Sequence, residues 1–261
     1  MNWDTGQVNR TIRLDSLPQA SALAYQPRLR DLAVRTRDGA VEIWRLGGDP
    51  PRRRFQLAGQ APDVAWISLS PDGAMVAVYS PETHGCAFWA VDEGARRFDV
   101  ANTGGVVAMN SRFIVSVPTW ETPRILEART GRHLVDLVGH KERVSDAVLP
   151  DGSSTAVTAS WDGTLRFWEL PSGRCLAVRR SQRQGIYGLA VSPDQQTLAA
   201  VGQDGTTRFW HLPSRRETVR WIERVPLWRA WFAPDGNTLL GSTGQQLILV
   251  RAPSLTDGVA F

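Results

Sequence analysis

The sequence predicts an all-β fold assembled from small four-stranded sheets that repeat about every forty residues. Three observations support this prediction. A tryptophan-containing phrase recurs at a nearly constant spacing, turn sequences recur in step with it, and convincing helical periodicity is absent. Short strands at regular spacing, separated by turn signals, are typical of all-β assemblies.

The recurring phrase is clearest in the second half of the chain. TLRFWELPSG at residues 164–173 returns as TTRFWHLPSR at residues 206–215, and looser copies lie at residues 40–48, 86–94 and 247–255. The tryptophan position is filled in turn by Trp44, Trp89, Leu126, Trp168, Trp210 and Val250. Successive positions are separated by 45, 37, 42, 42 and 40 residues. We therefore expect the four tryptophans at these positions to lie in the core.

Two kinds of turn divide each repeat into strands. Pro-Asp turns occur at residues 70–73, 149–152, 192–195 and 233–236, where proline presets φ for the first central position. Asp-Gly pairs begin at Asp38, Asp162 and Asp204, six residues before a tryptophan, and favour tight hairpins. Strands such as residues 165–168 carry bulk on both sides, which suits sheets stacked face to face. Four short strands per repeat indicate the blades of a β-propeller, about six in number.

Composition restricts where the protein acts. The 261 residues are 42% hydrophobic and 21% charged, as in globular proteins. No apolar run approaches the roughly 20 residues that span a bilayer, and residues 1–10 lack the apolar core of a signal peptide. We expect a cytoplasmic protein without membrane association, in which Cys86 and Cys175 remain reduced.

Almost all of the basic residues are arginines. The net charge is +4, and Lys141 is the single lysine among 30 basic residues. Arginine favours bidentate contacts with carboxylates and phosphates, so nucleic acid or acidic partners are alternatives. The arginines are scattered among acidic residues, with short clusters only at residues 50–55 and 179–183. This pattern does not favour nucleic acid.

The best repeat, VGHKERVSDAVLPDGSSTAVTASWDGTLRFWELPSG at residues 138–173, resembles the WD-repeat β-propeller family. Repeats of that family open with Gly-His and close their third strand with Trp-Asp. Only Gly139-His140 preserves the first pair, and only Trp3-Asp4 preserves the second. The resemblance implies one domain over residues 1–261, with repeats at residues 17–61, 62–104, 105–139, 140–182, 183–224 and 225–261. The third repeat should be the least regular, because it lacks both turn sequences and the tryptophan.

The resemblance also implies a role for the beginning of the chain. Residues 1–16 look like the end of a blade, and Val8 to Leu14 form the expected outer strand that pairs with the last blade, residues 227–251. Such pairing would close the ring and remove a free sheet edge. Seven blades are commoner than six in the family. The alternative is therefore a fragment whose missing blade lies upstream or on another chain.

Ser160, Asp162 and His140 raise the question of hydrolase chemistry. In the family, a histidine, a Ser/Thr, the hairpin aspartate and the tryptophan form a buried hydrogen-bonded tetrad, which here implies His140, Thr158, Asp162 and Trp168. A hydrolase would also need an oxyanion hole, and the nucleophile motif GxSxG is absent. His84-Gly85-Cys86 lacks a second pair of zinc ligands, and no phosphate-binding loop motif occurs. We expect no catalytic residue, metal or cofactor.

Family members commonly bind partners on the rim of the central channel. The resemblance places such contacts just before the hairpin aspartate and near the start of the innermost strand, at Arg37, Trp120, Trp161, Gln203, Tyr187 and Trp228. These residues imply a non-catalytic scaffold that binds a protein or peptide partner, alone or within a larger multidomain protein or complex. Packing of Trp161 and Trp228 against neighbouring blades is the structural alternative. The functional alternatives are a nucleic-acid-binding propeller with arginines gathered on one face, and an enzymatic propeller.

Overall fold

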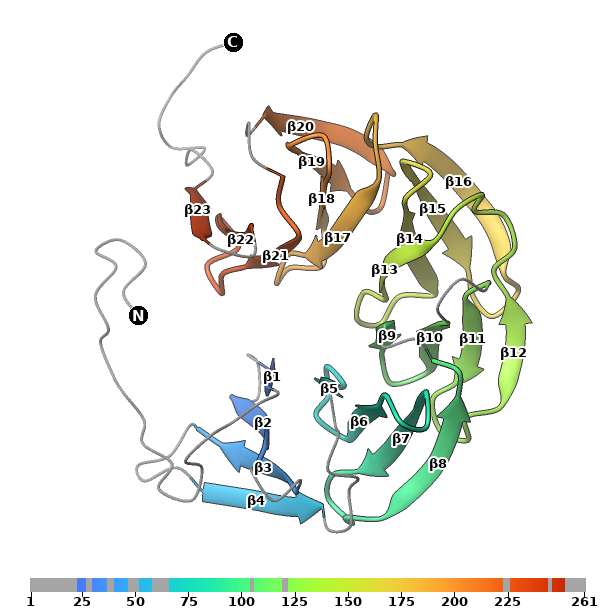
Figure 1. Ribbon diagram of the computed structural model, residues 1–261, viewed down its shortest axis with the longest axis vertical. Helices are drawn as coiled ribbons and strands as arrows, with labels where there is room; N and C mark the ends of the chain where they lie inside the picture. Colours follow the sequence, from blue (N-terminus) through green and yellow to red (C-terminus); the bar gives the residue numbers. More distant parts are fainter. Residues whose placement is uncertain are drawn as a thin grey trace. The chain divides into compact units, whose positions relative to one another are not determined.

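The computed structural model describes residues 23–26, 30–36, 40–46, 52–57, 66–103, 106–118, 122–222, 226–243 and 246–251. Every regular element among these residues is a β-strand, which confirms the all-β prediction. The strands form six antiparallel sheets, five of four strands and one of three (Figure 1). The chain divides into two compact units, residues 1–99 and 100–261, with the boundary inside strand β8.

The first unit contains two sheets whose faces pack together. Their strands are β1 (Leu23–Gln26), β2 (Asp31–Arg35), β3 (Val41–Arg45) and β4 (Arg52–Leu57), then β5 (Trp66–Leu69), β6 (Met75–Ser80), β7 (Gly85–Ala90) and β8 (Arg96–Ala101). Ala33 and Ile43 of the first sheet form one apolar cluster with Val76 and Val78 of the second. Trp44 and Trp89, which we expected in the core, are half-buried, and Trp89 packs against this cluster. The Arg96 guanidinium lies over the Trp89 ring, 5.8 Å from its centroid.

The second unit contains the other four sheets. Their strands are β9 (Val106–Met109), β10 (Phe113–Val117), β11 (Arg124–Glu127) and β12 (His133–Asp136); β13 (Val144–Val148), β14 (Thr155–Ser160), β15 (Thr164–Glu169) and β16 (Arg174–Arg180); β17 (Ile186–Val191), β18 (Thr197–Gly202), β19 (Thr206–His211) and β20 (Arg216–Ile222); and β21 (Arg229–Phe232), β22 (Thr238–Ser242) and β23 (Leu247–Arg251). Within each sheet, every strand pairs with the next strand along the chain. Within this unit, β12, β16 and β20 lie on the outer side and β9, β13 and β17 on the inner side (Figure 1).

The sheet β13–β16 is buried on both faces. Trp168 packs with Val115, Ile125 and Leu137 on the side of the preceding sheet. Phe167, the next residue along β15, belongs to the cluster on the side of the following sheet, which includes Trp210. Because successive side chains of a strand point to opposite faces, adjacent bulky residues serve two neighbouring interfaces. This arrangement confirms the prediction of sheets stacked face to face.

The third repeat forms a complete sheet, β9–β12, despite its irregular sequence. Leu126 occupies the tryptophan position and is 3% exposed. The turn before β10 is built by Asn110, whose Oδ1 accepts hydrogen bonds from the backbone N–H groups of Arg112 and Phe113, both at 2.9 Å. An asparagine side chain can replace a Pro-Asp-Gly turn in this way. The turn therefore persists although its usual sequence is absent.

The last sheet, β21–β22–β23, has three strands among the described residues. The strand predicted at residues 8–14 lies outside the described part of the chain. Its pairing with residues 227–251, and with it the closure of the last blade, stays a prediction. The assignment of residues 1–261 to a single domain likewise stays a prediction.

The first strands of neighbouring sheets in the second unit are joined by polar contacts. Ser145 Oγ on β13 donates to the carbonyl oxygen of Ile186 on β17 at 2.6 Å. The Asp146 carboxylate accepts the N–H of Leu189 at 2.9 Å and that of Ala147 at 2.8 Å. Burial raises the pKa of Asp146 to about 6, although these N–H groups and the charge of Arg229 act in the opposite direction.

The raised pKa makes the contribution of Asp146 to stability depend on pH. Between pH 3.8 and about 6, the folded protein holds a proton that the unfolded chain releases. The contribution is therefore fully present below pH 3.8 and is lost as pH rises through about 6. We predict that the Asp146→Asn variant becomes more stable relative to the wild type as pH rises from about 4 to about 7. The difference between their free energies of unfolding should change by about 1–3 kcal/mol over this range. Urea unfolding across this range measures the difference, and identical profiles for both proteins would contradict it.

Candidate functional site

One hydrogen-bonded chain links four elements of the sheet β13–β16. Nδ1 of His140, in the loop before β13, lies 3.0 Å from Asp162 Oδ2, and its Nε2 lies 2.7 Å from Thr158 Oγ1. Trp168 Nε1 on β15 donates to the same Thr158 oxygen at 2.9 Å. The side chains of His140 and Asp162 are only 3% and 8% exposed. The structure thus brings together the four residues of the expected tetrad, and their polar atoms face one another rather than solvent.

The residues that resembled a hydrolase are occupied by structural contacts. Ser160 Oγ donates to the carbonyl oxygen of Glu142 at 3.0 Å and accepts the N–H of Asp162 at 3.1 Å. Burial alone would raise the pKa of Asp162, but hydrogen bonds from His140, Thr164 and the Lys141 amide outweigh burial and hold the pKa well below its usual range. Asp162 therefore stays charged as an internal acceptor, and Ser160 lacks a free hydroxyl for nucleophilic attack.

The equivalent network in the next sheet is incomplete. The positions 42 residues further on are Gln182, Ala200, Asp204 and Trp210. Gln182 Nε2 donates to the carbonyl oxygens of Ala200 and Thr206 at 3.2 and 2.9 Å. Because alanine has no hydroxyl group, Trp210 Nε1 is buried without an acceptor among the described residues. The indole nitrogen that Thr158 satisfies in one sheet is unsatisfied in the next.

The predicted binding residues that the structure describes lie where the first strand of a sheet begins and its second and third strands are joined. We call this end of each sheet the hairpin end. It is fixed by the register pairs Val144↔Ser160, Ile186↔Gly202 and Arg229↔Ser242. Trp161 follows Ser160 directly, and Gln203 follows Gly202. Arg37 and Trp120 lie outside the described residues.

Two aromatic groups are presented at the hairpin end. Trp161 is 39% exposed, and the Arg143 guanidinium lies over its ring, 5.3 Å from the ring centroid. Gly185 lies against Trp161, where a Cβ would stand 3.2 Å from its Cα. Tyr187 and Trp228 stack with centroids 5.0 Å apart at 14°, and Trp228 is 57% exposed. Both tryptophans thus pack on neighbouring residues, as the structural alternative expected, yet each keeps a large exposed surface.

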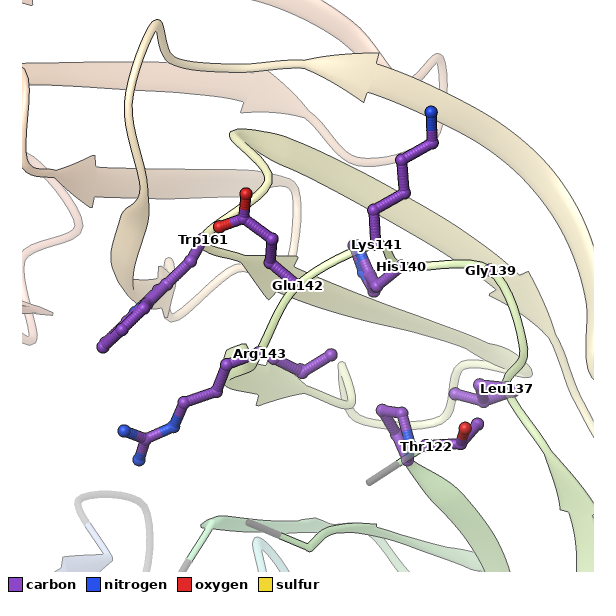
Figure 2. Close-up of a pocket in the computed structure, with 10 residues that line it drawn as sticks. Thr122, Leu137, Gly139, His140, Lys141, Glu142, Arg143 and Trp161 are labelled. Carbon is purple, nitrogen blue, oxygen red and sulfur yellow. The ribbon is translucent and has the colours of Figure 1, made fainter. Parts of the chain in front are cut away.

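A pocket of about 580 Å³ opens beside Trp161 (Figure 2). Its lining residues are Thr122, Pro123, Leu137, Gly139, His140, Lys141, Glu142, Arg143, Val144 and Trp161. In Figure 2, Arg143 and Trp161 extend in the same direction, whereas Lys141 points away from the opposite side of the loop. Sequence reasoning missed Lys141 and Arg143. Their position directly after Gly139-His140 was the available signal.

A metal centre and a helical membrane span are both without a counterpart in the described residues. No group of three or more His, Cys, Asp or Glu side chains is arranged to hold a metal ion there. In the same part of the chain, no helix has the length and apolar character that a membrane crossing needs.

Comparisons with known proteins agree with the geometry. The family model "WD domain, G-beta repeat" matches residues 131–169 and 173–211. Each match begins before the outer strand of one sheet and ends with the third strand of the next, at β15 and β19. Both matches therefore include a buried tryptophan of the repeat, Trp168 or Trp210.

Residues 131–211 thus contain WD repeats, and the recurring four-stranded sheets are like those of the WD-repeat β-propeller family. Two similar relatives come from mouse (Mus musculus). WD repeat and SOCS box-containing protein 1 is 42% identical over 73 residues, which are 27% of this chain and 17% of that protein. Striatin-4 is 23% identical over 191 residues, which are 66% of this chain and 25% of that protein. This WD-repeat chain thus spans a quarter or less of the length of these relatives.

The tetrad of the WD repeat gives a second stability prediction. Thr158→Ala removes the acceptor of Trp168 Nε1 and the partner of His140 Nε2, leaving two buried polar groups unpaired. We expect a loss of about 1–3 kcal/mol in the free energy of unfolding. Thr158→Ser keeps the hydroxyl group and should lose clearly less. Equal losses in the two variants, measured by urea denaturation, would show that the hydrogen bonds contribute little.

The incomplete network predicts the opposite effect in the next repeat. Ala200→Ser places a hydroxyl group at the position equivalent to Thr158, where it can accept from Trp210 Nε1. We expect a gain of about 0.5–1.5 kcal/mol. Ala199→Ser is the matched control, because Ala199 points to the other face of β18 and is fully buried in apolar surroundings. A thermal melt should rank Ala200→Ser above the wild type and the control below it; the reverse order would refute the assignment.

Proposed function

We propose that this chain is a protein-interaction scaffold that binds a protein or peptide segment at the hairpin end of its second unit. The observation that carries the proposal is the exposure of Trp161 and Trp228 at the same end of two sheets, β13–β16 and β21–β23, that lie on either side of β17–β20. Tryptophan, tyrosine and arginine are the residue types enriched in binding hot spots. Single exposed apolar residues are common, but ordered aromatic groups beside a pocket are typical of recognition surfaces.

The aromatic groups are held in place before any partner binds. Trp161 lies between Gly185 and Arg143, and Trp228 rests on Tyr187. Fixing a side chain on binding costs about 0.5–1.5 kcal/mol, so groups that are already ordered lose less entropy. A short partner segment could therefore gain useful affinity from few contacts.

The residues that could react are engaged in structural hydrogen bonds, which supports a scaffold without catalysis. The hydroxyl group of Ser160 donates to a backbone carbonyl, and both ring nitrogens of His140 have partners inside the tetrad. The name of the first relative pairs a WD repeat with a SOCS box in one protein. That combination supports the proposal that this chain works with further domains or partner chains.

The proposal predicts that partner binding depends on the two exposed tryptophans. Trp161→Ala/Trp228→Ala should weaken capture of specific partners at least about tenfold, as expected for hot-spot residues. The control variant is Val178→Ala/Val219→Ala, because these residues are 44% and 57% exposed on the outer strands β16 and β20. Quantitative affinity capture compares both variants with the wild type after melting curves establish that all three are folded.

Recovery of the same partners in the same amounts by the tryptophan variant would refute binding at the hairpin end. Loss of partners in the valine variant alone would place the interaction on the outer strands. Isothermal titration calorimetry of a recovered partner with the purified chain then separates partners that bind the chain directly from those captured through another protein.

A further inference from the structure

At the hairpin end, cationic side chains are mostly exposed, whereas the hairpin aspartates face the backbone. Lys141, Arg183 and Arg229 are exposed there, and Arg143 is half-buried over Trp161. These four residues precede or begin the first strands β13, β17 and β21. We call them the cationic rim. They belong to three neighbouring sheets of the second unit and share their end with the exposed tryptophans.

Lys141 and Arg183 hold equivalent places in successive repeats, 42 residues apart. The backbone N–H of Lys141 donates to Asp162 Oδ2, and that of Arg183 donates to Asp204 Oδ2, both at 3.0 Å. Each aspartate therefore turns its carboxylate inward to the backbone, while the neighbouring cationic side chain extends outward. The same local structure places a cation at the surface of both sheets.

Exposed negative charge is scarce at this end. Within the described residues of β13–β23 and the loops that join them, Glu142 is the exposed carboxylate of the hairpin end. The Asp162 side chain is buried, Asp204 is half-buried, and both carboxylates accept hydrogen bonds from the backbone. The opposite end of the same sheets is mixed in charge, because Asp194 and Asp235 are exposed there together with Arg174 and Arg216. Positive charge thus predominates on the surface that carries Trp161 and Trp228.

The pocket of Figure 2 adds an apolar element to this surface. Leu137 and Val144 are buried and contribute to its lining, together with Pro123. Arg143 and Trp161 line the same pocket, and Lys141 borders it with its side chain directed away from them (Figure 2). Its volume of about 580 Å³ falls in the usual range for ligand pockets and accommodates a large apolar side chain. A ligand that carries an apolar group with negative charge beside it would complement both the apolar and the cationic residues around the pocket.

We propose that the partner segment is an acidic stretch of protein, whose carboxylates face the cationic rim while an apolar or aromatic side chain enters the pocket. This inference rests on the proposed function and specifies its partner class. A nucleic acid matches less well, because the cations are few and Glu142 stands among them, which suits a ligand with a few separated charges better than a continuous row of phosphates. The four cations on three sheets match a short segment with a few carboxylates.

The test uses the full chain and an unbiased displayed peptide library, selected at low salt. Enriched peptides should be rich in Asp and Glu around an apolar or aromatic residue. Fluorescence anisotropy with labelled enriched peptides then gives Kd for the variants. Lys141→Glu/Arg183→Glu should raise Kd at least about tenfold, and raising NaCl from 50 to 500 mM should also weaken binding.

The matched control reverses two exposed arginines at the opposite end, Arg129→Glu/Arg216→Glu, and should change Kd less than about twofold. A labelled fifteen-residue oligothymidine serves as the nucleic-acid probe. Tighter binding of this probe than of any selected peptide, lost on reversal of Lys141 and Arg183, would overturn the proposal in favour of nucleic acid.

The remaining outcomes separate this inference from the proposed function. Enrichment of neutral or basic peptides that still require Trp161 and Trp228 would overturn the acidic preference and leave binding at the hairpin end intact. If no selected peptide loses affinity for the Trp161→Ala/Trp228→Ala variant, both the acidic preference and binding at the hairpin end are overturned. An equal loss of affinity in the charge-reversed pair and its control would overturn a specific role for the cationic rim.

Discussion

The structure depends on the packing of small sheets that are buried on both faces. Trp168 and Phe167 are neighbours in β15, yet they fill the cores on two different sides of one sheet. Four short strands provide too little core to be stable alone, so each sheet of the second unit relies on its neighbours. This constraint leaves the sheet ends, rather than the sheet faces, as the surfaces that remain available for recognition.

The hairpin end combines rigidity with exposure. The aspartates of the hairpins hold its loops in place, because they accept hydrogen bonds from the backbone N–H groups of Lys141 and Arg183. Because these backbones are held, the side chains that extend from them occupy defined positions. Binding residues on loops held by a rigid scaffold are a general solution in proteins, and each repeat here contributes its own loop to it.

The repeats have kept their packing more fully than their polar networks. Asp162 and Asp204 make parallel contacts in successive sheets, but only Thr158 supplies the hydroxyl group that joins tryptophan to histidine. The sheet β17–β20 forms the same four-stranded structure with Gln182 and Ala200 in their places. Apolar stacking therefore maintains the sheet, whereas the tetrad adds a local contribution to one of them.

The sequence by itself determined the all-β class, the repeat and the strands, because tryptophan spacing and turn chemistry act locally along the chain. It also identified the residues of the tetrad through a resemblance, and it missed the turn at Asn110, where a side chain replaces the usual backbone motif. Only the tertiary structure decided that Trp161 lies between Gly185 and Arg143, and that cations face outward where carboxylates face inward. The reason is physical: exposure and charge sorting arise between neighbouring sheets, and no local pattern of residues specifies which side of a loop meets solvent.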